Sequence, residues 1–464
     1  MVGVGRMAFY LKGTSSMRLT LRSTAKYILI FFCTFFLLFV LIPGAASIPK
    51  TWIKSKMLES AEYMSNHKTS FLITDWISAS QIDHYADCIN LSIADQLDEE
   101  KPLQSAMWTV YYDSTSEEAN ESFLNSVRYD LPGNTEYLRY WHGSAAMMRF
   151  LHLILNVKQI YFLHAVLMAV LILILVLLLM KNGYKAEAIS FALSMIVVSI
   201  WYVPFCLEYT YSFLCMLIAS IAGTLLALNR RDKWIGSFFL IVGMATVYFD
   251  FLTTETLSLL IPLLLLCRIK RAEKSRKNQW IDSIRWSIAW GIGYIGMWMM
   301  KWVLASVVLS RDVMPYVTGH ISARLDGEVS GGSITGNLYI DTLLRNMRKL
   351  FPYEYGISGA ILVVVFIFLV FFLPAVKGRI CIGRKIKMSK IFLYIVIGLI
   401  PFVRFLVLSN HSYIHSIFTY RALASTILAL CFIILELVEP VRSPTPYRKA
   451  VNTHGSDNSH ALPE

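Results

Sequence analysis

Apolar residues gather into long, nearly uninterrupted runs that shorter polar stretches separate. A helix that crosses a bilayer needs about 20 consecutive, mostly apolar residues. The pattern therefore predicts an all-α polytopic membrane protein with about ten transmembrane helices. Two of the runs are short enough to form a broken or tilted pair, residues 234–249 and 257–267. The predicted spans are residues 27–48, 160–180, 188–205, 209–228, 234–249, 257–267, 286–309, 356–374, 391–408 and 417–437.

The first run follows a basic segment. Residues 1–26 carry no acidic side chain and five basic ones, Arg6, Lys12, Arg18, Arg22 and Lys26. Because Lys and Arg are enriched in cytoplasmic flanks, this segment predicts a cytoplasmic N-terminus. The small residues 44–47 resemble the cleavage site of a signal peptide, which is the alternative. The length of the run favours a retained membrane anchor.

The sign of the charge differs between the two sets of loops that the predicted spans separate. Residues 49–157 hold 15 of the 31 acidic residues and no spanning run, which predicts a large, α-rich extracytoplasmic loop with interfacial helices. The most basic connections fall on the opposite side, so both termini are predicted to be cytoplasmic. The resulting division is 1–26 cytoplasmic N-terminus, 27–48 first span, 49–157 extracytoplasmic loop, 158–309 spans two to seven, 310–355 second extracytoplasmic loop with Gly331 and Gly332, 356–438 spans eight to ten, and 439–464 disordered cytoplasmic tail.

Composition narrows the class of protein. Of the 464 residues, 56% are hydrophobic and 16% are charged, against roughly 45–50% and about 25% in soluble domains. These values exclude a secreted soluble enzyme, a nucleic-acid-binding protein and a disordered scaffold. The net charge of +12 is explained by basic cytoplasmic loops, so no nucleic-acid partner is required. The seven cysteines contain no CxxC pair and predict neither a disulfide framework nor a zinc site.

Ionisable side chains at membrane depth are candidates for function because they are costly in lipid. Asp250 and Glu255 lie between two predicted spans. They form either an ordinary polar turn or a pair of carboxylates that line an outer cavity. Lys301 lies in the outer half of a span. It either snorkels to the interface or faces a cavity as a cation suited to a phosphate or to Asp250.

Two arginines and two histidines frame a second predicted outer turn. Arg404 precedes this turn, and Arg421 lies just inside the next span. His411 and His415 are four residues apart, so they would share one face of a helix. Two ligands make a weak metal site, whereas Arg suits bidentate contacts with phosphate. We interpret the segment as a basic site for phosphate oxygens, with a solvated turn as the alternative.

The first predicted external loop carries candidate bases. Helical spacing in residues 81–91 places Asp83 and Asp87 on one face. Such a surface helix is commonly structural, but a carboxylate here could take a proton from an acceptor hydroxyl. Further along, residues 137–143 lead into an apolar run that charged residues interrupt, which is typical of an interfacial helix.

Three segments resemble a known group of proteins. They are RYWHG at Arg139–Gly143, FDFLTTE at Phe249–Glu255 and NHSYIHSIFTYR at Asn410–Arg421. In these motifs the chain resembles an uncharacterised group of multi-span membrane proteins from Gram-positive bacteria. In layout, with one span, a large acidic external loop and many further spans, most of the chain resembles the GT-C membrane glycosyltransferases.

The resemblance implies an enzyme of the bacterial plasma membrane. It would move a sugar from a polyprenyl-phosphate donor to a cell-surface glycan or lipid acceptor at the outer face of the bilayer. An acid of the first external loop is the base in that superfamily, and Asp83 or Asp87 matches it by position, with Asp75 as a weaker match. The adjacent acidic pair that is usual in the superfamily is absent, which leaves open both the base and any metal requirement.

The resemblance also implies roles for the other candidates. The leaving phosphate would be neutralised by Arg404, Arg421, Lys301 or the histidines His411 and His415. Trp141 and His142 would help to shape the acceptor side, and Arg139 would also bind substrate. Asp250 and Glu255 leave a divalent metal open, and no other cofactor is implied.

Two other classes compete with this interpretation. One is a flippase or transporter of a lipid-linked glycan, which should carry charged residues through the middle of several spans. The centres of the predicted spans are largely apolar, which favours chemistry or binding at the outer face. The other is a polysaccharide polymerase or ligase, which would also use a large external loop rich in Arg and His.

Overall fold

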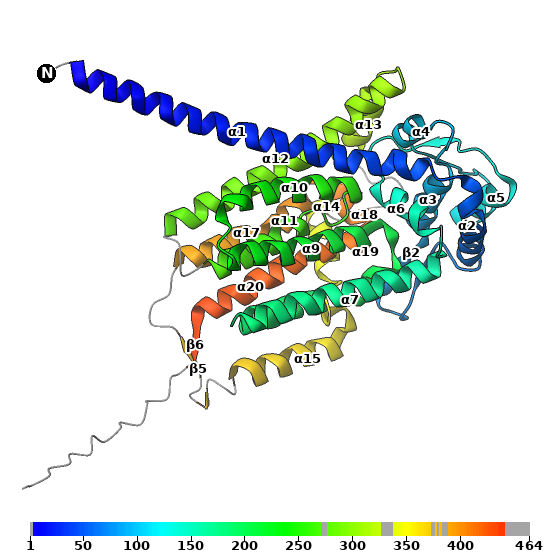
Figure 1. The fold of residues 1–464 in the computed structure, drawn as a ribbon. Helices are drawn as coiled ribbons and strands as arrows, with labels where there is room; N and C mark the ends of the chain where they lie inside the picture. The colour runs from blue at the N-terminus through cyan, green and yellow to red at the C-terminus, as the bar shows by residue number, and fades with distance from the viewer. Residues whose placement is uncertain are drawn as a thin grey trace, which may run out of the picture.

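The computed structural model describes residues 3–270, 276–325, 337–372, 376–377, 380–382 and 388–440. Gly331, Gly332, most of the basic residues predicted for the last cytoplasmic loop, and the tail after residue 440 lie outside this range. Helices dominate the described part (Figure 1). Its strands form three short antiparallel pairs, each of two strands.

Seven helical segments in the described ranges are long and apolar enough to cross a membrane. They lie in α1 (Gly3–Ala46), α7 (Val157–Lys181), α9 (Leu207–Leu228), α12 (Arg276–Val308), α15 (Gly356–Ile367) with its flanking turns, α17 (Met388–Val407) and α20 (Ala424–Leu437) with the residues before it. The three other predicted spans correspond to shorter helices, α8 (Lys185–Val197), α10 (Ile235–Phe249) and α11 (Leu257–Ile269). An all-α, multi-pass membrane fold is thus confirmed, while the number of ten spans stays a prediction.

The segment after α1 folds into a separate layer at one end of the helix bundle (Figure 1). We call residues 50–151 the cap. Its strands pair antiparallel, β1 with β2 and β3 with β4, so that Ser70 lies opposite Asp83. The cap contains α2 (Lys50–Ser65), β1 (Ser70–Leu72), η1 (Ser78–Ser80), β2 (Gln81–Asp83), α3 (His84–Asp95), α4 (Pro102–Trp108), β3 (Val110–Tyr111), α5 (Ala119–Tyr129), β4 (Thr135–Glu136) and α6 (Gly143–Leu151).

Shorter elements connect the spanning helices. Several of them lie at the same end of the bundle as the cap, and they are the ones that approach the site described below. The connecting elements are η2 (Ile200–Phe205), η3 (Asp232–Trp234), α13 (Met314–Leu325), α14 (Leu338–Met347), η4 (Tyr353–Tyr355), η5 (Phe368–Phe372), β5 (Ile380–Ile382), α18 (Ser409–Ile414), α19 (Ser416–Thr419), η6 (Tyr420–Leu423) and β6 (Val438–Pro440).

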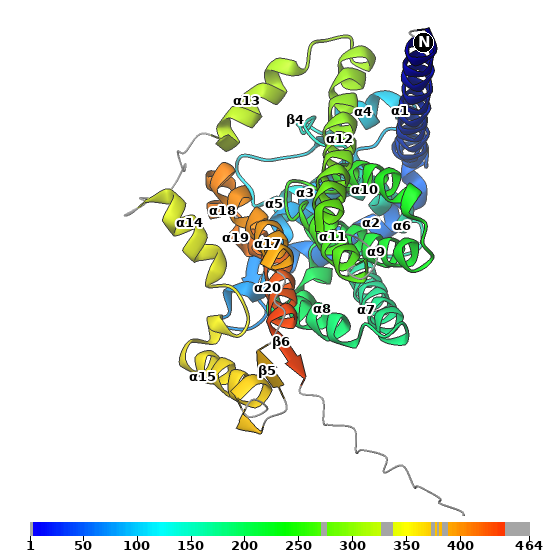
Figure 2. The same cartoon turned by 90° about the vertical axis from the view of Figure 1, so that its left-hand side faces the viewer.

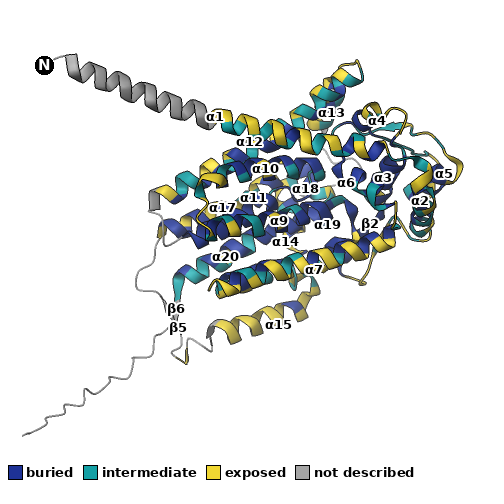
Figure 3. Ribbon diagram, viewed as in Figure 1, coloured by how far each residue is buried: buried dark blue, intermediate teal, exposed yellow. Residues whose placement is uncertain are grey.

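Burial separates central helices from peripheral ones. In α9 and in the segment 416–437, 61% of the most apolar window is buried, against 17% in α1 and 6% in the segment 353–370. Viewed from the end opposite the cap, α11 and α20 occupy the centre, and α1, α7 and α15 occupy the periphery (Figure 2). The peripheral helices expose many apolar side chains (Figure 3). Lipid is the environment that such surfaces require.

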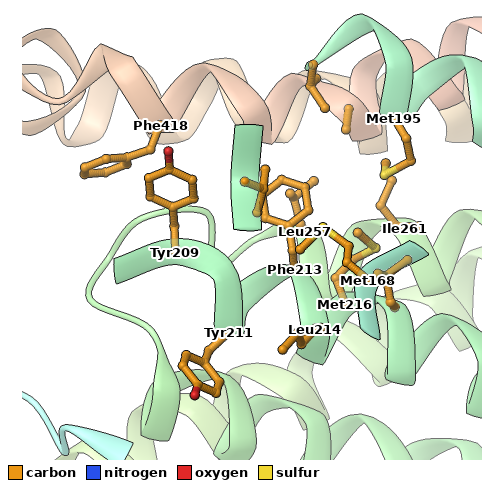
Figure 4. Close-up of a cluster of buried hydrophobic side chains, with 14 of the residues drawn as sticks. Met168, Met195, Tyr209, Tyr211, Phe213, Leu214, Met216, Leu257, Ile261 and Phe418 are labelled. Carbon is orange, nitrogen blue, oxygen red and sulfur yellow. The ribbon is translucent and has the colours of Figure 1, made fainter. Parts of the chain in front are cut away.

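The bundle interior is built on α9. Its Tyr209, Phe213 and Met216 are fully buried, and they point into a cluster with side chains of α7, α8, α11 and α19 (Figure 4). At the end opposite the cap, Arg268 of α11 joins α8 and α20 through Glu187 (Nε–Oε1 2.8 Å) and Glu436 (Nη1–Oε1 2.5 Å). A buried cation with two carboxylate partners is far less costly than an unpaired one.

Close contact between α10 and α12 depends on two glycines. A Cβ atom at Gly293 would lie 2.2 Å from the carbonyl oxygen of Leu240, and one at Gly243 would lie 2.1 Å from that of Trp290. Small residues allow membrane helices to approach until their backbones touch. The two glycines therefore set the distance between α10, which ends at the candidate site, and α12, which supports the cap.

Substitution of Gly293 by alanine is expected to destabilise this crossing. The added methyl group must push backbone apart, which costs about 1–3 kcal/mol, and the melting temperature of the purified protein in detergent should fall. Gly291→Ala is the matched control on the same helix, because a Cβ there meets no described atom within 4 Å. An equal melting temperature for the two variants would contradict the role of Gly293.

Candidate functional site

A cavity of about 630 Å³ lies where the cap meets the bundle. Its walls come from β2, α3, β3, β4 and residues 137–142 of the cap, from α13, from α18 with the residue after it, from the cap end of α9 and from the turn between α10 and α11. Polar and aromatic side chains predominate. The lining includes Asp83, Tyr85, Asn90, Tyr111, Asn134, Glu136, Tyr137, Arg139, Tyr140, His142, Glu208, Phe251, Tyr316, His320, His411 and His415.

The three motif segments converge on this cavity. RYWHG contributes Arg139 and His142, FDFLTTE contributes Phe251, and the third segment contributes His411 and His415. More than 100 residues separate each motif from the next in the sequence. The fold thus brings together the three segments that the sequence singled out.

Asp83 and Glu136 are the acids of the cap that line the cavity, and Glu136 is paired with Arg311. Asp83 ends β2 and caps α3, where its Oδ1 accepts a hydrogen bond from the Ala86 N–H at 3.1 Å. Burial raises the pKa of the Asp83 carboxyl, although the N–H groups of Ala86 and Tyr85 oppose the rise. A carboxylate of raised pKa is a better proton acceptor near neutral pH.

Asp87 lies one turn further along α3 and is fully buried. Its Oδ2 accepts a hydrogen bond from the Tyr161 hydroxyl at 2.6 Å, and its Oδ1 accepts one from the Leu207 N–H at 2.7 Å. Burial raises the pKa of this carboxyl well above its usual value. Both oxygens serve to hold α3 against α7 and α9, so the geometry gives Asp87 a supporting position behind Asp83.

Arg139 lines the cavity between two aromatic rings. Its guanidinium carbon lies 4.3 Å from the ring centre of Tyr137 and 5.4 Å from that of Tyr140. Nη1 lies 3.1 Å from Nδ1 of His320 on α13. A planar guanidinium held by rings and a neutral imidazole nitrogen keeps its charge available for an anion.

The helix α13 covers one side of the cavity. The hydroxyl of Tyr316 donates to the carbonyl oxygen of Glu136 at 2.9 Å, and Arg311 pairs with the Glu136 carboxylate at 2.5 Å. These contacts attach α13 and the segment before it to β4 of the cap. They position His320 beside Arg139.

His142 and Trp141 take opposite directions. His142 lines the cavity, and its Nε2 lies 2.8 Å from the carbonyl oxygen of Tyr137. Trp141 is fully buried away from the cavity and donates from Nε1 to the carbonyl oxygen of Met297 at 2.8 Å. Trp141 therefore fastens the cap to α12.

His411 and His415 line the cavity together, with ring centres 4.7 Å apart. His411 in α18 and His415 directly after it thus lie on one face, as their spacing predicts. No group of three or more His, Cys, Asp or Glu that could hold a metal ion is found among the described residues.

The acids and the arginine at the α10–α11 turn form a buried network below the cavity. Arg404 donates to Glu255 (Nε–Oε1 3.0 Å) and to the hydroxyl of Ser412 (3.0 Å), and it also contacts the carbonyl oxygen of Leu252. Asp250 accepts hydrogen bonds from the hydroxyls of Ser212 and Thr253. This network fixes Phe251 and α18 in place.

Lys301 and Arg421 are buried cations that do not line the cavity, and no acid among the described residues lies at hydrogen-bond distance from either. Lys301 donates to the carbonyl oxygens of Ala106 and Met107, at 3.1 and 3.0 Å, at the end of α4. Arg421 donates to the carbonyl oxygen of Ala79 at 3.1 Å and lies over the ring of Tyr209. Each thus ties the cap to the bundle.

Sequence reasoning missed several residues of the cavity. Glu208 lies in the first turn of α9, and His320 lies on α13, within the second predicted extracytoplasmic loop. The tyrosines of the walls were also missed. Glu208 could have been found as the acid that precedes an apolar run, but nothing in the sequence pairs it with Asp83.

The fold and the cavity together define a multi-pass membrane protein with a polar, aromatic site at one end of its bundle. Comparisons with protein-family models, with curated proteins and with solved structures find no match to this chain.

Replacement of Arg404 by glutamine is expected to reduce the free energy of unfolding by about 3–5 kcal/mol, because Glu255 would remain buried without its partner. The double variant with Glu255→Gln should recover part of this loss. Arg348→Gln is the control, since Arg348 is exposed directly after the end of α14. Denaturant unfolding in detergent gives the free energy of unfolding of wild type, the two single variants and the double variant. Equal losses for Arg404→Gln and Arg348→Gln would contradict a stabilising role for the pair of Arg404 with Glu255.

Proposed function

We propose that the protein is a membrane glycosyltransferase. It takes a sugar from a polyprenyl-phosphate donor and transfers it to a glycan or lipid acceptor at the extracytoplasmic face. One observation carries the proposal: the same cavity at the edge of the membrane bundle is lined by the Asp83 carboxylate, the Arg139 guanidinium and aromatic side chains. A proton acceptor, a phosphate partner and stacking surfaces for sugar rings are the groups that this reaction needs.

Asp83 acts as the base in this mechanism. Its carboxylate removes the proton of an acceptor hydroxyl as the hydroxyl oxygen attacks the anomeric carbon of the donor. The bond between that carbon and the phosphate oxygen breaks, and its electron pair stays on the phosphate. The products are the glycosylated acceptor, polyprenyl phosphate and a proton on Asp83, which passes to water.

Arg139 stabilises the negative charge that develops on the phosphate. His320, His411 and His415 line the same cavity and supply further N–H donors. Arg404 and Arg421, which the resemblance offered for this role, are occupied by Glu255 and by backbone carbonyls. Preorganised donors in a site that excludes water stabilise such charge more strongly than water does.

The distribution of polar groups supports transfer over transport. The buried networks of Arg404 and Arg268 lie near opposite ends of the bundle. Arg268 is paired with two carboxylates of the protein, those of Glu187 and Glu436. The interior around α9 between the two networks is mainly aromatic and aliphatic. A path for a charged glycan through the bundle would need polar groups along that interior.

Asp83→Asn is expected to lower turnover at least about 100-fold, which is the scale of a general base. The assay supplies radiolabelled polyprenyl-phosphate sugars to the purified protein in lipid nanodiscs and follows the label into acceptors. Asp75→Asn is the matched control, because Asp75, the weaker match for the base, is an exposed acid of the same cap that does not line the cavity. Lipid scrambling without transfer from any donor would contradict the proposed function.

The pH profile should report the same group. Asp83 must be ionised to act as base, so kcat/KM should fall as the pH drops through its pKa, which burial raises above 3.8. The acid limb should disappear in Asp83→Asn. Protonation of a histidine near the phosphate would act in the opposite direction, and an acid limb that persists in the variant would exclude Asp83 as its source.

A further inference from the structure

His142 occupies an unusual place for its residue type. It precedes α6 with φ +58°, in the left-handed region that favours glycine or asparagine, and its side chain makes no capping hydrogen bond in the described part of the chain. A glycine would remove the strain, and a serine or aspartate would cap the helix. Backbone demands therefore do not explain a histidine here, and strained residues of this kind cluster at functional sites.

The fold fixes which nitrogen of His142 carries the proton. The carbonyl oxygen of Tyr137 can only accept a hydrogen bond, so Nε2 at 2.8 Å must be the donor. Burial, together with the nearby charges of Lys301 and Arg139, lowers the pKa of His142 to about 3. The ring is therefore neutral at physiological pH, and Nδ1 presents a lone pair.

That lone pair is buried without a protein partner. The side chain exposes 2% of its surface, and Nδ1 has no hydrogen-bond partner among the described residues. His142 nevertheless lines the cavity. A buried acceptor that protein groups leave unsatisfied is unfavourable unless a bound molecule supplies the donor.

Aromatic rings surround the imidazole. Ring centres of Tyr137 and Phe251 lie 4.8 and 5.3 Å from that of His142, and Phe251 also contacts Tyr140 at 5.4 Å. Flat aromatic faces suit the apolar face of a sugar ring, and a lone pair suits a hydroxyl but repels a phosphate. Arg139 supplies the cation on the same cavity.

We propose that Nδ1 of His142 accepts a hydrogen bond from one hydroxyl of a sugar ring that packs on the wall formed by Tyr140 and Phe251. His142 is thus a specificity-determining residue, and it selects substrates that carry a hydroxyl at this point of the ring. The inference rests on the proposed function for the identity of the ligand as a sugar. It separates a sugar subsite at His142 from a phosphate subsite at Arg139.

The experiment measures binding rather than turnover. Wild-type protein in nanodiscs is titrated with the methyl glycosides of glucose, galactose, mannose and N-acetylglucosamine, and then with monodeoxy derivatives of the best binder, by saturation-transfer NMR. One monodeoxy derivative should bind about fivefold more weakly than its parent, which matches the loss of one neutral hydrogen bond. In His142→Phe the parent should fall to the affinity of that derivative, and the derivative itself should be unaffected.

His164→Phe is the matched control, because His164 is also buried with an unpartnered Nδ1 in the described structure but does not line the cavity. It should leave every affinity unchanged. If His142→Phe does not fold, ¹⁵N-histidine spectra of the wild-type protein replace it. The parent glycoside should then shift the Nδ1 resonance that is lost in His142→Gln, and the deoxy derivative should not.

The outcomes separate the two proposals. Failure of every glycoside to bind, or equal binding by wild type and His142→Phe, overturns the subsite. Transfer from a polyprenyl-phosphate sugar would in that case still uphold the proposed function. Glycoside binding that depends on His142, without transfer from any donor, upholds the subsite and rejects the transferase. The Kd values of the free glycosides and of the lipid-linked donor are each compared between wild type and His142→Phe. If the substitution raises only the Kd of the free glycosides, the acceptor sugar occupies the subsite. If it raises the Kd of the lipid-linked donor, the donor sugar occupies it.

Discussion

A guanidinium enclosed by apolar helices is strongly unfavourable unless its N–H groups find acceptors. Arg404 meets this requirement through the Glu255 carboxylate, the Ser412 hydroxyl and the carbonyl oxygen of Leu252. Those three partners lie on the turn between α10 and α11 and on α18. The same contacts that satisfy one cation thus join two separate parts of the chain. Phe251 and His411 reach the cavity from these two parts, so the site depends on this pairing.

The cap is fastened to the bundle by the same principle, applied to backbone carbonyls. Lys301, Trp141 and Arg421 each donate across the junction between the cap and the bundle. Asp87 adds the reverse arrangement, because its carboxylate accepts from α7 and α9. Polar groups that lie deep in the fold therefore make the junction rigid. The cavity is the part of that junction where polar groups remain directed toward open space.

The sequence allowed a good prediction of the elements and a partial prediction of the site. Long apolar runs reveal helices directly, because hydropathy depends on local composition, and each predicted span overlaps a helix. Helical spacing pointed to Asp83, the motifs pointed to Arg139, His142, His411 and His415, and these five residues meet in the cavity. Asp250, Glu255, Lys301, Arg404 and Arg421 were named because charge is costly in lipid. That argument identifies important residues, but it does not distinguish a charge that binds a ligand from one that binds the protein.

What could not be predicted depends on contacts between distant segments. Nothing local to Lys301 indicates that two carbonyl groups at the end of α4 surround its ammonium group, some 195 residues away in the sequence. Glu208 and His320 face the cavity because α9 and α13 are positioned by the cap, and the cap is positioned by pairs such as Trp141 with Met297. Short spans posed a different difficulty. α8, α10 and α11 are 13 to 15 residues long, so length alone does not decide whether they cross the bilayer.

α12 has 33 residues, which corresponds to about 50 Å of helix, whereas the hydrocarbon layer is about 30 Å thick. Its tight crossing with α10 lies near its middle, at Gly293. The C-terminal half carries Trp298, which donates to the carbonyl oxygen of Arg139, and Lys301, which donates to that of Ala106. The crossing thus divides α12 into two parts of similar length. A single continuous helix therefore connects the wall of the cavity with the opposite end of the bundle.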